Sequence, residues 1–131
     1  MSLYLDTSAL AKLIISEAES GALRSWLGER RGQPLMTNAL GAVELQRLAA
    51  RVSAEAREAA VLLLARIDLL SLTQTVLSAA SQLPPPEVRT LDAVHVASAA
   101  EISDLQALVT YDSRMRATAH GYGLPVAAPG T

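Results

Sequence analysis

Cysteine and phenylalanine are both absent from this chain of 131 residues, and lysine occurs once, as Lys12. Without cysteine the chain forms no disulfide, no thiolate zinc site and no cysteine nucleophile, which suits a cytoplasmic protein. Without phenylalanine the core must be built mainly from leucine, alanine and valine. Aromatic residues make up only 3% of the chain, so we expect no extended platform for stacking bases.

Long apolar runs are missing as well. The longest extends from Ala59 to Ala65, which is too short to cross a bilayer. The N-terminal segment has no basic region and places Asp6 at the end of its first apolar stretch, so we expect no signal peptide. We therefore expect a cytoplasmic protein with no membrane partner.

Positive charge is also scarce, because the net charge is −2. A protein that coats nucleic acid is typically basic, so any nucleic-acid binding by this chain would have to come from local arginines, with or without the help of a metal. All basic residues except Lys12 are arginine, which suits bidentate contacts with phosphate. Genome composition explains the same bias and is the preferred explanation.

Short apolar strands alternate with helical segments along the chain. The pattern predicts strands at 3–5, 35–37, 67–72 and 107–110, and a short edge strand at 125–127. It predicts helices at 8–16, 19–30, 39–52, 54–66, 75–83, 90–102 and from 113 to about 121. Asn38 and Ser53 are the predicted N-caps of the third and fourth of these helices. This alternation predicts one domain over residues 1–131, a three-layer α/β/α sandwich around a mostly parallel sheet of four to five short strands. In such folds ligands bind beyond the carboxyl ends of the strands.

Four acidic residues interrupt or directly follow the apolar stretches. Asp6 and Asp112 come just after two predicted strands, whereas Glu44 and Asp92 fall on apolar faces of predicted helices. Acidic side chains are rarely buried unless they are paired or bind metal. Their positions therefore make them candidate functional residues.

Each acid taken alone also has a structural interpretation. Asp6 and Asp112 could cap helices, and Asp92 could interact favourably with the dipole of its own helix. Glu44 could pair with Arg47, three residues along the same helix. Taken together, the four acids are better explained by one site. Carboxylate oxygens are the ligands that Mg²⁺ prefers, and two adjacent ions can hold the attacking and leaving oxygens of a phosphodiester.

Polar neighbours of the acids are candidates for supporting roles. Thr7, Ser8 and Thr110 could orient the carboxylates, although helix capping explains them as well. His95 is expected to be a core or supporting histidine rather than a ligand, because metals with oxygen ligands do not need it. Arg89 and Arg114 are the first candidates for contacts with the RNA backbone, and solvated surface charge is the alternative for both.

Four short segments of the chain resemble the acidic signatures of PIN domains, and more narrowly those of VapC-type toxins from bacterial toxin–antitoxin pairs. Each motif is weak alone, but their order and spacing over nearly the whole chain are specific. Asn38 departs from the pattern, since many relatives carry a small hydroxyl residue there. The segments are Leu5-Asp6-Thr7-Ser8-Ala9-Leu10, Val43-Glu44-Leu45, Arg89-Thr90-Leu91-Asp92-Ala93-Val94-His95 and Thr110-Tyr111-Asp112.

The resemblance implies an endoribonuclease that depends on one or two Mg²⁺ or Mn²⁺ ions. It implies that Asp6, Glu44, Asp92 and Asp112 are both the catalytic and the metal-binding residues. It further implies a cognate antitoxin that blocks the active site, and commonly a homodimer.

Other functions remain open from the residues alone. A nuclease that cuts DNA would use the same acids, and a catalytically inactive PIN-like binding or regulatory module would need none of them as ligands. A phosphorylated receiver domain is disfavoured because it needs a late lysine, whereas Lys12 is early. No phosphate-binding P-loop motif is present.

Overall fold

The computed structural model describes all 131 residues, and five short parallel strands form a single sheet at its centre. The strand order is β3-β2-β1-β4-β5, and every neighbouring pair is parallel. The strands are β1 (Ser2–Leu5), β2 (Leu35–Asn38), β3 (Asp68–Leu70), β4 (Leu105–Val109) and β5 (Val126–Ala127).

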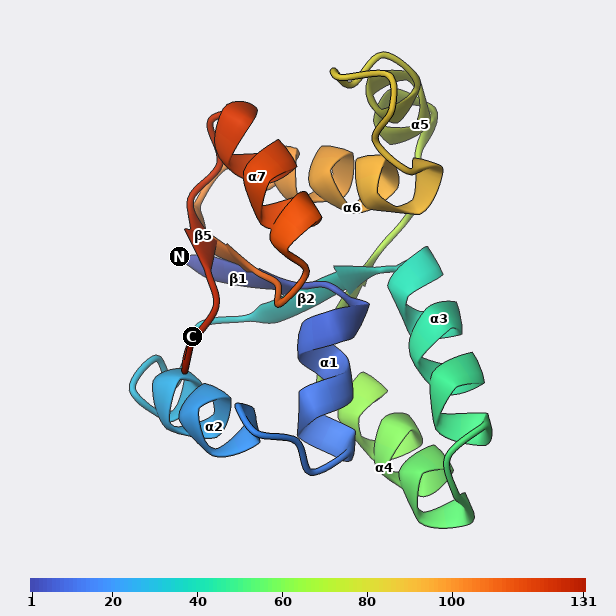
Figure 1. The fold of residues 1–131 in the computed structure, drawn as a ribbon, viewed down its shortest axis with the longest axis vertical. Coiled ribbons are helices and arrows are strands. Elements are labelled where there is room, and N and C mark those ends of the chain that lie inside the picture. Colours follow the sequence, from blue (N-terminus) through green and yellow to red (C-terminus); the bar gives the residue numbers. More distant parts are fainter.

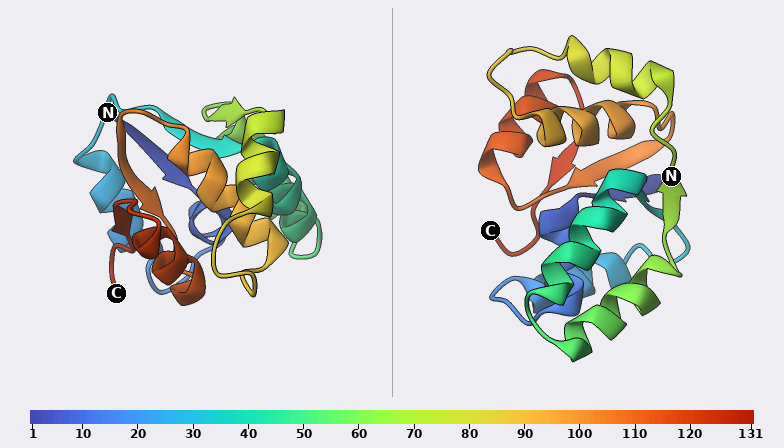
Figure 2. Two further views of the ribbon diagram at one scale, coloured as in Figure 1. Left: turned by 90° about the horizontal axis from the view of Figure 1, so that it is seen from above. Right: turned by 90° about the vertical axis from the view of Figure 1, so that its right-hand side faces the viewer.

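Seven helices cover the two faces of this sheet (Figures 1 and 2). One face carries α1 (Thr7–Ile14), α2 (Ser20–Gly28), α3 (Ala39–Ala50) and α4 (Ala54–Leu64). The other carries α5 (Gln74–Ser81), α6 (Thr90–Ala100) and α7 (Ser113–Gly121). The predicted three-layer α/β/α sandwich is thus confirmed. None of the helices combines the length and apolar character needed to span a bilayer.

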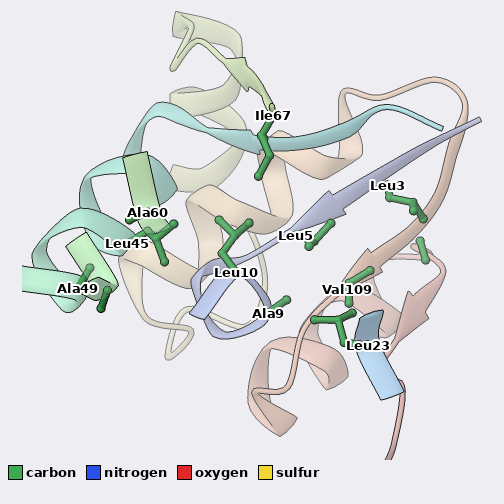
Figure 3. Packing of buried hydrophobic residues seen from close by; sticks show 12 residues of the cluster. Leu3, Leu5, Ala9, Leu10, Leu23, Leu45, Ala49, Ala60, Ile67 and Val109 are labelled. Carbon is green, nitrogen blue, oxygen red and sulfur yellow. The ribbon is translucent and has the colours of Figure 1, made fainter. Parts of the chain in front are cut away.

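Alternation along β1 divides the interior into two cores. Leu3 and Leu5 belong to the core beneath α1 to α4, whereas Tyr4 belongs to the core beneath α5 to α7. All three side chains are fully buried, because the central strand is covered on both faces. The first core contains only leucine, alanine, valine and isoleucine, as expected for a chain without phenylalanine (Figure 3).

Most of the predicted helices and strands recur with bounds shifted by one or two residues. The prediction for β3 was too long, because only Asp68–Leu70 pairs with β2, over three residue pairs. Ile67 lies before the strand and packs into the first core instead. A strand at the edge of a sheet pairs on one side only, so its length depends on its single neighbour, which a local pattern does not reveal.

Side-chain caps fix where several helices begin. Asn38 accepts a hydrogen bond from the Gly41 amide at 2.7 Å, and its own amide group donates to Ser98 Oγ at 3.0 Å. Ser53 accepts from the Ala56 amide at 3.0 Å. Both caps were predicted from the sequence. Asn38 also ties the end of β2 to α6, and this contact holds α3 and α6 on either side of the carboxyl ends of the strands.

The strand order places a crevice beside β1. The chain runs outward from β1 through β2 to β3, then crosses to the opposite side for β4 and β5. The connections after β1 and β4 therefore diverge, and the space between them is the usual ligand site of open parallel sheets. Asp6 follows β1 and Asp112 lies three residues after β4, so both residues lie at this crevice.

Candidate functional site

All four acids line one cavity of about 290 Å³. Asp6 and Asp112 come from the carboxyl ends of β1 and β4, Glu44 lies on α3 and Asp92 lies in the first turn of α6. The fold therefore brings together acids that are up to 106 residues apart in sequence, from Asp6 to Asp112. The remaining lining residues are Thr7, Ser8, Arg89, Thr90, Leu91, His95 and Met115.

Asp6 is the most deeply placed of the acids, with only 2% of its surface exposed. Its Oδ1 accepts hydrogen bonds from Ser8 Oγ at 2.7 Å and from the Ala9 amide at 3.0 Å, and its Oδ2 accepts from Thr110 Oγ1 at 2.6 Å. Burial raises the pKa of this carboxyl, and the bonds from Thr110 and Ser8 oppose that rise only in part. Asp6 therefore caps α1, as its structural interpretation predicts, and also lines the cavity.

Asp112 has the same double position at the start of α7. Its Oδ1 accepts from the amides of Arg114 at 2.8 Å and Met115 at 3.1 Å, which caps the helix. Its Oδ2 lies 3.4 Å from Arg89 Nη2. One oxygen therefore holds the helix while the other faces the cavity guanidinium.

Asp92 lies on the other side of that guanidinium. Arg89 Nε is 3.3 Å from Asp92 Oδ2, and the Asp92 side chain is 16% exposed. Burial raises the pKa of Asp92, Arg89 opposes the rise and the charge of Asp112 adds to it, so the pKa is raised overall. Arg89 therefore offsets the cost of burying the Asp92 charge only in part.

Glu44 does not pair with Arg47, so the structural interpretation of Glu44 as half of a helix-surface ion pair is wrong. Its Oε1 is instead 2.7 Å from His95 Nε2 and accepts from Thr7 Oγ1 at 2.8 Å. Burial raises the pKa of Glu44, but the hydrogen bonds from His95 and Thr7 outweigh burial and lower the pKa overall.

The geometry of α3 explains this outcome. Its buried face contains Ala42, Leu45 and Ala49, and Glu44 lies at the edge of that face, where it meets Thr7 of α1 and His95 of α6. Arg47 is exposed to solvent on another side of the helix. Spacing within one helix gives no information about partners on other helices.

His95 is a core histidine in the sense predicted, because only 2% of its surface is exposed. Its Nε2 meets Glu44, while its Nδ1 is 2.7 Å from the hydroxyl oxygen of Tyr4. Tyr4 was not singled out from the sequence because a tyrosine in a short buried strand resembles a core residue. The available signal was its hydroxyl, since a buried tyrosine normally finds a hydrogen-bond partner.

The predicted polar neighbours also take definite positions. Thr7 donates to Glu44, and Ser8 and Thr110 donate to Asp6, so each hydroxyl contacts an acid. Arg89 lines the cavity, whereas Arg114 is exposed and lines a neighbouring hollow together with Asp92 and Thr118. Of the two arginines, only Arg89 has its side chain within hydrogen-bonding distance of the acids, since Arg114 contacts Asp112 through its backbone amide.

The chemistry of the donors suits a hard cation, because four carboxylates line the cavity and Arg89 is the only arginine or lysine there. As the side chains stand, however, no three acidic or histidine residues are grouped so that they could hold one ion. Arg89 lies between Asp92 and Asp112, and hydrogen bonds engage Asp6 and Glu44. The residue types therefore fit a metal, while their present arrangement satisfies the carboxylates with protein donors.

Comparison with known proteins gives a consistent result. The sequence model of the PIN domain matches residues 3–121. Ribonuclease VapC35 of Mycobacterium tuberculosis is 44% identical over 131 residues, covering 98% of this chain and 97% of the relative.

Two solved structures illustrate the similarity in fold. VapC20 of Mycobacterium tuberculosis, described as a Sarcin-Ricin loop cleaving toxin, has a TM-score of 0.71 at 21% identity, covering 88% of this chain and 94% of that one. VapBC2 from Rickettsia felis, bound to a DNA fragment from its promoter, has a TM-score of 0.76 at 14% identity, and the match covers 97% of this chain and 98% of that one. At these identities the two structures support the fold alone.

Proposed function

The chain belongs to the PIN domain family, and we propose that it is a metal-dependent endoribonuclease, the toxin of a toxin–antitoxin pair. The observation that carries the proposal is the convergence of Asp6, Glu44, Asp92 and Asp112 on one cavity at the carboxyl ends of the strands. The 44% identity to a ribonuclease over nearly the whole chain supports RNA as the substrate.

The proposed cofactor is Mg²⁺ or Mn²⁺, with one or two ions held by Asp6, Asp92 and Asp112. When bound, such an ion lowers the pKa of a water molecule and stabilises negative charge on the phosphate. Glu44 either adds a ligand or orients the attacking water. Its lowered pKa keeps it ionised and therefore able to accept a hydrogen bond from that water.

The remaining residues hold the acids and approach the substrate. Thr110 and Ser8 keep Asp6 in place through short hydrogen bonds. Arg89 is 62% exposed at its side chain while contacting two of the acids, so it lies within reach of a phosphate at the cavity. We assign it the contact with the RNA backbone, where arginine gives bidentate hydrogen bonds.

The proposed partners are an RNA substrate, a cognate antitoxin and a second copy of the chain, in the cytoplasm. The likeness to VapBC2 supports the antitoxin partner. The helical stripe of Leu23, Trp26 and Leu27 is a poor docking surface because Leu23 is fully buried and the other two pack against the first core.

A comparison of RNA with DNA of the same sequence tests the substrate class. We expect the purified protein to cut the RNA in Mg²⁺ or Mn²⁺, and not in EDTA, while the DNA stays intact. Asp92→Asn should abolish cutting without unfolding the protein, whereas Asp68→Asn, an exposed acid on β3, should behave like the wild type. Preferential cutting of DNA would favour the alternative nuclease, and wild-type activity in Asp92→Asn would remove Asp92 from the site.

A further inference from the structure

A chain of buried hydrogen bonds connects the centre of the sheet to the cavity. The hydroxyl of Tyr4, on β1, is 2.7 Å from His95 Nδ1 on α6. His95 Nε2 is in turn 2.7 Å from Glu44 Oε1 on α3. Tyr4 and His95 are 0% and 2% exposed, so neither polar group exchanges this partner for water.

Packing alone does not account for these polar groups. Tyr4 belongs to the second core, together with apolar residues such as Val96 and Leu108. An apolar pair at positions 4 and 95 would fill similar space without removing polar atoms from water, which is costly unless every atom finds a partner. Here the two polar groups are partners of each other, and His95 also contacts Glu44.

The direction of the hydrogen bonds follows from the acceptor at the end of the chain. An ionised carboxylate only accepts hydrogen bonds, so His95 Nε2 carries a hydrogen and donates it to Glu44. In a neutral imidazole Nδ1 is then the acceptor, and the Tyr4 hydroxyl is its donor. Tyr4 thus selects the form of His95 that donates toward the cavity.

The two oxygens of Glu44 are treated differently. Oε1 is engaged by both His95 and Thr7, whereas no protein group forms a hydrogen bond with Oε2. We propose that Tyr4 and His95 are positioning residues that fix Oε1 of Glu44 and leave Oε2 available to a metal ion or to the attacking water. This inference rests on the proposed function. Partners behind a metal-binding side chain commonly fix its orientation in this way.

The backbone of α3 makes this arrangement possible. A Cβ atom at Gly41 would clash with Thr37 Oγ1 and would lie 3.2 Å from His95 Cε1. The absence of a side chain at position 41 therefore lets α3 approach the His95 ring closely. Glu44, one helical turn later, is thereby brought into hydrogen-bonding distance of Nε2.

The first test is Tyr4→Phe, which removes one oxygen atom and keeps the ring. We expect Mn²⁺ binding, measured by calorimetry, to weaken about tenfold or more and kcat for RNA to fall by a similar factor. KM for RNA should stay near the wild-type value, because Tyr4 is buried away from the substrate. Tyr122→Phe is the matched control, because Tyr122 is 43% exposed and lies outside the cavity.

A second pair of variants tests His95 directly. His95→Gln keeps an N–H donor for Glu44 and should retain most of the Mn²⁺ affinity. His95→Leu removes the donor and should lose most of that affinity. This pair also provides the comparison if Tyr4→Phe does not fold. Equal Mn²⁺ affinities in the Gln and Leu variants would overturn the inference.

A double-variant cycle separates positioning from general damage. In a Glu44→Gln background, Tyr4→Phe should have no further effect on Mn²⁺ binding through the aspartates, since its action passes through Glu44. An undiminished effect in that background, or a Tyr4→Phe protein that binds Mn²⁺ and cuts RNA like the wild type, would overturn the inference alone. Wild-type protein that neither binds Mn²⁺ nor cuts RNA would overturn the proposed function, and this inference with it.

Discussion

At the scale of single residues, the site combines two carboxyl groups whose ionisation is disfavoured with one whose ionisation is favoured. The pKa values of Asp6 and Asp92 are raised mainly by burial, whereas hydrogen bonds from His95 and Thr7 lower that of Glu44. Groups with perturbed pKa values that gather in one cavity are typical of functional sites. The unfavourable charge is what a bound cation would offset.

Asp92→Asn should leave the protein at least as stable as the wild type in EDTA at neutral pH. Because the folded-state pKa of Asp92 is raised, its contribution to stability is greatest below the unfolded-state pKa and is lost as pH rises through the folded-state value. Asparagine removes this loss, so the two thermal midpoints should converge as the pH falls below the usual aspartate range. A large drop in midpoint for Asp92→Asn at neutral pH would show that the ion pair with Arg89 is structural instead.

Thr110→Val should destabilise the protein at neutral pH by about 1–3 kcal/mol, because it leaves buried Asp6 without one of its hydrogen-bond donors. Thr110→Ser keeps the hydroxyl and is the matched control. Urea unfolding measures the difference. If the Val and Ser variants unfold at the same urea concentration, the hydroxyl does not stabilise the Asp6 carboxylate.

At the scale of helices and strands, local patterns predicted the order of the elements and several helix caps, but not the partner of Glu44 on another helix. Asn38 and Ser53 were predicted because a cap depends on residues within one turn. The partner of Glu44 was missed because His95 lies 51 residues away and meets it only when α3 packs near α6. The four acids were found because each follows a strand or lies on an apolar helix face, both of which are local features.

Gly41→Ala tests how closely α3 must approach the rest of the fold. Alanine normally stabilises a helix relative to glycine, by about 1 kcal/mol. At position 41 the new Cβ atom would clash with Thr37, which is β-branched and fully buried, so we expect a net loss of about 1–3 kcal/mol. Gly21→Ala on α2 is the control, because nothing lies within 4 Å of its added Cβ. Equal stabilities of the two variants in urea would contradict the close approach.

At the scale of the whole molecule, a net charge of −2 gives no general attraction for RNA. Attraction must therefore arise locally, and Arg89 is the only arginine that lines the acidic cavity. The sheet order explains why the cavity is where it is, since the reversal between β1 and β4 opens the space that the acids surround.

Arg89→Ala should raise KM for RNA. It should also reduce the slope of log KM against log salt concentration by about the amount that one phosphate contact contributes. Arg114→Ala should have a smaller effect, because Arg114 lies outside the cavity. Steady-state cleavage at several salt concentrations measures both quantities. A larger effect of Arg114→Ala would reassign the phosphate contact to the neighbouring hollow.

The most direct test of the central claim is to incubate purified protein with total cellular RNA in Mg²⁺, Mn²⁺ or EDTA, beside Asp6→Asn. The account predicts discrete RNA fragments that require a divalent ion and disappear in the variant, which should remain folded. Equal cleavage by Asp6→Asn, or cleavage that persists in EDTA, would contradict a metal-dependent site built on these four acids.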